Sequence, residues 1–115
     1  MRRDPDCLFC RIVKGEIPSA KVYEDDAVLA FRDINPAAPT HVLVVPKDHV
    51  ATLAECGDGD RALLADVMLA AGKVAGLEKL DAFRLIVNNG SGAGQTVFHL
   101  HAHVLGGKPM GERLL

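Results

Sequence analysis

The stretch HLHAHVL, residues 99–105, decides how the rest of the chain is interpreted. Strict alternation of histidine with an apolar residue predicts a β-strand, because successive side chains of a strand leave opposite faces. Leu100, Ala102 and Val104 would then face a core. The three histidines, about 6.5–7 Å apart, would line the other face of the strand: His99, His101 and His103.

Three of the five histidines of the chain fall within this stretch. One explanation is a half-buried strand whose polar face is imidazole by chance, or an adventitious metal-binding patch. Imidazole, however, is a poor generic surface group and serves well as nucleophile, proton carrier or metal ligand. We therefore favour a chemical role for the histidines.

A glycine-rich loop, NNGSGAGQT at residues 88–96, runs directly into the histidine strand. Glycines allow the backbone N–H groups of such a loop to converge on an anion. An anion-binding loop followed by a row of histidines predicts chemistry at phosphorus.

The chain has 115 residues, which suits one domain with a single core, and we expect that domain to span residues 1–115. A net charge of −2 without a basic stripe argues against a nucleic-acid polymer or an anionic membrane as partner. Arg2 and Arg3 precede Asp4 and Pro5 rather than an apolar run, so no signal peptide is expected. Three cysteines, an odd number, favour a reducing compartment, and we expect a cytoplasmic protein.

The remaining chain predicts mainly strands with one long helix between them. Short helical turns are expected from Cys7 to Gly15. Strands are expected at 21–24, 27–31, 41–46 and 83–88, and a helix at 60–77. The apolar stripe of that helix, which includes Met68, is assigned to the core. This order of elements predicts an α+β fold with a meandering antiparallel sheet.

The histidine strand, the glycine loop and the segments around Asp33 and His41 together resemble the histidine-triad (HIT) family, and most nearly its Hint branch of purine nucleoside phosphoramidases. The resemblance covers the chain from Cys7 to about Met110. It implies a five-stranded antiparallel meander sheet with one long helix and a short N-terminal helix. It also implies a homodimer in which two such sheets join into one of ten strands.

The resemblance makes His101 the nucleophile, which forms a covalent nucleotidyl-histidine. The backbone carbonyl of His99 would hold its tautomer, His103 would contact the phosphate, and His41 would complete a proton path. Three residues of the glycine loop match family positions that bind phosphate or serve the leaving group: Asn88, Gly94 and Thr96. Thr96 stands where the Hint branch commonly has serine and keeps the hydroxyl. No cluster of magnesium ligands is evident, so no magnesium requirement is expected.

The nucleoside site implied by the resemblance comes from the first half of the chain. Asp33 matches a carboxylate that accepts from the ribose hydroxyls; alternatively it only caps its loop. The residues that match an apolar slot for a purine base are Leu8, Phe9, Ile12, Phe31 and Ile34. For each of these five the alternative role is packing in the core.

Cys7 and Cys10 have the spacing with which two thiolates bind one tetrahedral zinc, although a lone C-x-x-C is a weak signal and two buried thiols are the alternative. Some family members complete such a site with histidines that correspond to His49 and His99. The expected cofactor is therefore one structural zinc. A different arrangement, in which the two later triad histidines bind zinc together with His41, would make an open metal site and block the nucleophile.

The function predicted from these features is hydrolysis of the P–N bond of purine nucleoside 5′-phosphoramidates such as AMP-linked amines. Two alternatives stay open. One is a dinucleoside polyphosphate hydrolase or nucleotidyltransferase of the same family, and the other is a nucleotide-binding regulatory protein.

Overall fold

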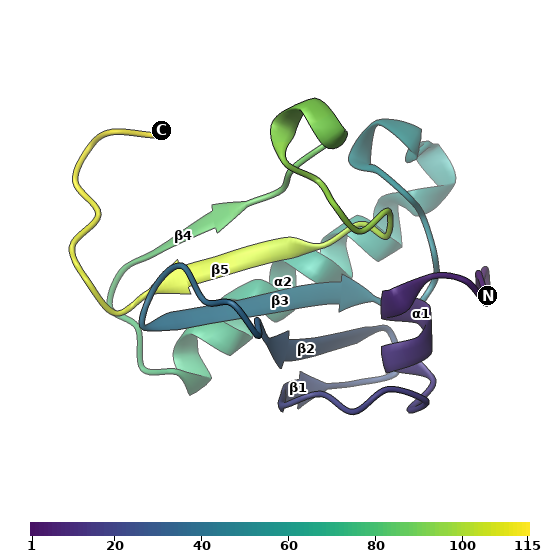
Figure 1. The fold of residues 1–115 in the computed structure, drawn as a ribbon, viewed down its shortest axis with the longest axis horizontal. Coiled ribbons are helices and arrows are strands. Elements are labelled where there is room, and N and C mark those ends of the chain that lie inside the picture. Colours follow the sequence, from purple (N-terminus) through teal and green to yellow (C-terminus); the bar gives the residue numbers. More distant parts are fainter.

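The computed structural model describes residues 1–115, and its centre is a five-stranded antiparallel sheet with a helix on each face (Figure 1). The strands are β1 (Lys21–Glu24), β2 (Val28–Arg32), β3 (Thr40–Pro46), β4 (Phe83–Ile86) and β5 (Ala102–Gly106). The helices are α1 (Leu8–Val13) and α2 (Arg61–Leu77), and short 3₁₀ turns lie at Leu53–Glu55, Asp58–Asp60 and Ser91–Ala93. The predicted α+β fold is confirmed.

The first three strands form the predicted meander, but the sheet order is β1-β2-β3-β5-β4. The chain leaves β3, crosses one face as α2, and returns at the far edge as β4. β5 then fills the place between β3 and β4, antiparallel to both. The histidine segment therefore enters the middle of the sheet, where both neighbours hold it.

Two cores cover the two faces of the sheet. α2 packs small residues, Ala70, Ala71 and Val74 among them, on one face. α1 packs Phe9 and Ile12 on the other. β3 is buried along almost its whole length because it is covered from both sides, which explains its continuous apolar run.

Strand β5 is shorter than the alternating pattern predicts. It begins at Ala102, so His99, Leu100 and His101 precede the strand instead of continuing its ladder. The ladder with β3 ends near Pro46, which has no N–H to donate. His99 is fully buried, and the prediction that all three histidines line one open strand face is wrong for this residue.

Helix α2 confirms the predicted range to within one residue, but Met68 is wrongly assigned to the core. Its side chain is 59% exposed, and the neighbouring Leu69 is 65% exposed. The buried stripe runs through Val67, Ala71 and Val74 instead, and small side chains let the helix lie close to the sheet. No helix combines the length and the apolar character needed to cross a membrane.

Candidate active site and metal centre

His101 is held in one tautomer. Its Nδ1 lies 2.7 Å from the backbone carbonyl oxygen of His99, which can only accept, so Nδ1 carries the proton and donates it. The lone pair is therefore on Nε2. The residue is 7% exposed, and this burial lowers the pKa of His101 below its ordinary value, so the ring is neutral at pH 7. The site thus holds a neutral imidazole with a free nitrogen, as a nucleophile requires.

The tautomers of His41 and His103 follow from a chain of contacts. The backbone N–H of Ala37 donates to Nδ1 of His41 (3.0 Å), which places the proton of His41 on Nε2. That nitrogen is 2.9 Å from Nδ1 of His103 and donates to it. The proton of His103 is consequently on Nε2.

Nε2 of His103 is buried and has no hydrogen-bond partner. A buried N–H without an acceptor is costly, so this group is suited to donate to a bound molecule. The pKa of His103 is lowered to about 4, chiefly by burial and then by the neighbouring His101 and His41. The ring centroids of His101 and His103 are 5.0 Å apart, so a neutral donor without an acceptor lies beside the free nitrogen-bearing ring of His101.

A hollow of about 300 Å³ is lined by residues of the first half of the chain. Of the residues expected at a nucleoside site, its lining includes Ile12, Phe31, Asp33 and Ile34. Leu43 also lines it and was not among the sequence predictions. The register explains its place, because Leu43 is paired with Phe31 on β2 and with His103 on β5. The hollow therefore adjoins the histidine cluster.

Leu8 and Phe9 do not line this hollow. Phe9 is 5% exposed and packs its ring against Phe31 and His101, at centroid distances of 5.5 and 5.1 Å. Leu8 is 44% exposed and is not part of this core. Ile34 is 91% exposed and lies at the rim of the hollow.

Asp33 makes contacts that suit both roles considered for it. One carboxylate oxygen, Oδ1, accepts from the backbone N–H of Asn35 (2.8 Å), which caps the loop. The other oxygen, Oδ2, is 3.4 Å from Nε2 of His41. The carboxylate thus lies between the hollow and the histidines, with capacity to accept further hydrogen bonds.

The glycine loop is organised by Gln95, a residue that the sequence did not single out. Its side chain is 3% exposed, accepts from Gly90 N–H (2.8 Å) and donates to the carbonyls of Ala51 and Val97. Gly94 has φ +91°, in the left-handed region, and a Cβ there would lie 3.8 Å from Nδ2 of Asn88. Asn88 and the Gly94 backbone are therefore neighbours, and Thr96 lies two residues further on with its side chain exposed.

Cys7, Cys10, His49 and His99 converge, with one ligand atom from each lying within 4.8 Å of all the others. Cys7 precedes α1 and Cys10 lies in its first turn. His49 follows β3, and His99 precedes β5. The sulfur–nitrogen distances are 3.3 to 3.5 Å, and the two Nδ1 atoms are 3.1 Å apart.

These distances fit a tetrahedral zinc. Ligand bonds of about 2.0 Å to nitrogen and about 2.3 Å to sulfur place nitrogens about 3.3 Å apart and sulfur about 3.5 Å from nitrogen. Nε2 of His99 donates to the carbonyl oxygen of Pro46 (2.7 Å), so its Nδ1 presents a lone pair to the cysteines. Burial also lowers the pKa of His99 to about 4, which keeps that lone pair free.

A second group of ligand atoms, from Asp33, His41 and His103, is also compact. Here the Ala37 N–H forces the proton of His41 onto the nitrogen that faces His103. The two rings thus form a hydrogen bond where a metal would need two lone pairs. The local geometry disfavours the open metal site considered above.

Comparison with known proteins places this geometry in a family. The family model for the HIT domain matches residues 14–110. A HIT-like protein of Synechocystis is 52% identical over 105 residues, covering 90% of this chain and 92% of the relative. The 14 kDa zinc-binding protein of Zea mays is 46% identical over 110 residues, covering 93% of this chain and 86% of that protein.

Among solved structures, a HIT family hydrolase from Clostridium thermocellum superposes with a TM-score of 0.95 at 49% identity, covering 97% of this chain and 99% of the other. The fold and the histidine cluster define a histidine-triad protein. The chain belongs to the HIT family.

Proposed function

We propose that this protein is a hydrolase of the Hint branch that cleaves the P–N bond of purine nucleoside 5′-phosphoramidates. The observation that carries the proposal is the pairing of a neutral His101, with its lone pair on Nε2, and the N–H of His103 that has no acceptor. The relation to a Clostridium protein described as a hydrolase supports the class of reaction. The proposed domain spans residues 1–115, and its free cysteines suit a cytoplasmic protein.

In the first step Nε2 of His101 attacks phosphorus, a P–N bond to the histidine forms, and the P–N bond to the amine breaks. The ring becomes a phosphorylated imidazolium, whose Nδ1–H keeps its hydrogen bond to the His99 carbonyl. His103 donates from Nε2 to a phosphoryl oxygen, where negative charge accumulates. The amine leaves with a proton from solvent, which we propose is relayed by the exposed Thr96 hydroxyl and the path through His41.

In the second step water attacks phosphorus, its proton passes to solvent along the path that supplied the amine, and the bond to His101 breaks. The nucleoside monophosphate leaves, and His101 returns to its neutral tautomer. Asn88 and the Gly94 amide would hold the phosphoryl oxygens through both steps. Because these neutral donors stabilise the charge, we expect turnover without magnesium.

The nucleoside would occupy the hollow beside His103, with the base against Ile12, Phe31 and Ile34 and the ribose at Asp33. Phe9 then supports the site from behind, through its contacts with Phe31 and His101. Leu8 does not line the hollow, and we propose no contact between it and the nucleoside.

Asp33→Asn is expected to weaken AMP binding about tenfold and to reduce the preference for ribose over 2′-deoxyribose, because the charged acceptor for the hydroxyls is lost. Binding of AMP and dAMP to both forms of the protein, measured by calorimetry, gives the two ratios. If the ratio of AMP to dAMP affinity were unchanged, Asp33 would have only the role of capping its loop through the hydrogen bond to Asn35.

The zinc would act as a structural element. Four protein ligands close its coordination, so it holds α1 against the exit of β3 and leaves His101 and His103 free. His99 would serve twice, because its Nδ1 ligates the metal and its carbonyl holds the tautomer of His101. The maize relative described as a zinc-binding protein supports this assignment.

We also propose that the protein is a homodimer. β4 is an edge strand, and Phe83 at its start exposes 44% of its surface. Pairing two β4 edges would cover the unpaired backbone groups and continue the sheet across the dimer. Sedimentation equilibrium should then give twice the chain mass of 12.3 kDa.

A substrate panel tests the proposed reaction directly. AMP-linked and GMP-linked amines should be hydrolysed with kcat/KM at least tenfold above that for a dinucleoside polyphosphate. The reverse order would favour the polyphosphate hydrolase. Binding of AMP without turnover of any member would favour a nucleotide-binding regulatory protein.

A further inference from the structure

We infer that Arg2 is a positioning residue for the metal centre and acts by holding His49 in place. Arg2 ties the segment that carries His49 to the start of α2, so that the fourth ligand is in position before a metal binds. This inference rests on the zinc site proposed above.

Arg2 contacts both the residue before His49 and His49 itself. The backbone carbonyl of Arg2 accepts from the backbone N–H of His49 at 2.8 Å. The backbone N–H of Arg2 donates to Oδ1 of Asp48. Its guanidinium also binds the Asp48 carboxylate, with Nη2 to Oδ2 at 2.9 Å and Nε to both oxygens at 3.2 Å.

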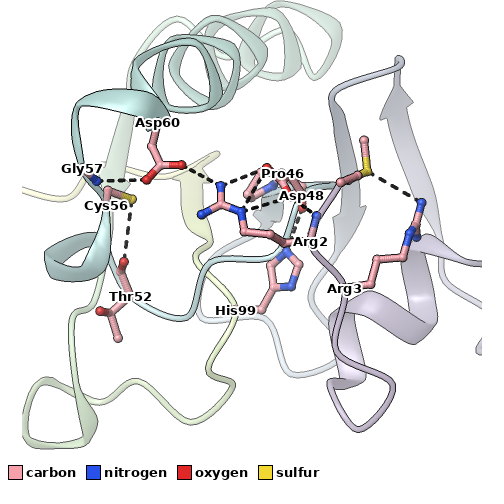
Figure 2. Close-up of polar contacts among 10 residues, drawn as sticks. Arg2, Arg3, Pro46, Asp48, Thr52, Cys56, Gly57, Asp60 and His99 are labelled. Atoms are coloured by element: carbon pink, nitrogen blue, oxygen red, sulfur yellow. Dashed lines mark hydrogen bonds and ion pairs between the residues drawn. The ribbon is translucent and has the colours of Figure 1, made fainter.

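The same guanidinium reaches a second carboxylate at the N-terminus of α2. Nη2 of Arg2 donates to Oδ1 of Asp60 at 2.6 Å, and the other oxygen of Asp60 accepts from the Gly57 N–H at 2.9 Å. Asp60 is only 9% exposed, so its position is set by its surroundings. Figure 2 shows Arg2 between the two carboxylates.

His49 is the ligand that most needs such support. Cys7 and Cys10 are fixed by α1, whose side chains fill a core, and the His99 ring is fixed by its bond to Pro46. His49 lies beyond the end of β3 and is only half-buried. Apart from the metal cluster, its ring makes no hydrogen bond, so the backbone around it must set its position. Outer contacts that orient a ligand typically change metal affinity 10–100-fold.

The test compares Arg2→Gln with Arg3→Gln in the zinc-loaded protein. Arg3 is a matched control, because it is the next residue, has the same charge and makes only an exposed contact with the Met1 sulfur. With a chromophoric chelator in excess, zinc release should be about tenfold faster in Arg2→Gln than in wild type. Arg3→Gln should stay within about twofold of wild type.

Two further variants separate positioning from general destabilisation. Arg2→Lys keeps the charge but loses the planar fork, so its release rate should lie between those of wild type and Arg2→Gln. Asp60→Asn should accelerate release, and combining it with Arg2→Gln should add little, because both changes break the same bridge. The absorption spectrum of the cobalt-substituted protein should show an altered ligand field in Arg2→Gln at temperatures where circular dichroism shows a folded protein.

Equal release rates for Arg2→Gln and Arg3→Gln would overturn the role of Arg2 while leaving the zinc site intact. A wild-type protein that binds no zinc would overturn the zinc site and this inference together.

Discussion

His101→Ala is expected to abolish amine release from an AMP-linked amine, with kcat reduced on the order of 10⁴-fold or more. The variant should still bind AMP within a few-fold of wild type, because the loss falls on the transition state and the hollow that would receive the nucleoside is lined by other residues. Steady-state kinetics and calorimetric titration with AMP measure the two effects.

The covalent intermediate gives this prediction a second measurement. Rapid acid-free quenching of wild-type protein with radiolabelled AMP-amine should trap label on the peptide that contains residues 99–103. The label should be acid-labile and base-stable, as expected for a phosphorus–nitrogen bond. His101→Gly tests the same point, because added imidazole can enter the vacated space and restore part of the turnover. Wild-type turnover in His101→Ala, or label on another peptide, would refute the mechanism.

Replacing Cys7 and Cys10 together by serine is expected to remove the metal and to lower Tm by about 10 °C or more. The physical reason is that a closed Cys₂His₂ site contributes its binding free energy to folding. Zinc content by elemental analysis and Tm by calorimetry measure the change. Protein that remains folded should keep activity, because neither thiol contacts the proposed reacting atoms.

Cys56→Ser is the matched control for this double variant. Cys56 is the third free cysteine, lies outside the metal cluster, and has its thiol near the Thr52 carbonyl. It should keep about one zinc per chain and a Tm close to wild type. Wild-type protein purified without chelator but free of zinc would contradict the prediction. So would a double variant that retains the metal.

The sequence alone determined the features that depend on local pattern. The apolar run of β3, the helical spacing of α2 and the turns around the hairpin predict their elements, because each reflects which face of an element is buried. The histidine alternation marks the segment proposed to react, and the Cys7–Cys10 spacing marks half of the proposed metal centre. The resemblance to the HIT family added the two histidines that complete it.

Only the tertiary structure decided how these residues are divided between two sites. Alternation places the three triad histidines together, yet His99 turns to the cysteines and bonds to Pro46, 53 residues away. His101 instead bonds to the His99 carbonyl, and His103 bonds to His41. The tautomers of these histidines are also set by backbone groups of other segments. The Pro46 carbonyl sets the tautomer of His99, and the Ala37 N–H sets that of His41.

The residues that the sequence missed have the same explanation. Leu43 reaches the hollow through strand register, Gln95 through bonds to three backbone segments, and Arg2 through carboxylates far along the chain. Met68 is exposed although the helical period assigns it to the apolar stripe of α2. The period shows where the stripe lies, but how much of its width the sheet covers depends on how closely the helix packs. A pattern in the chain specifies which side a residue faces. Which atoms that residue contacts depends on segments that only folding brings together.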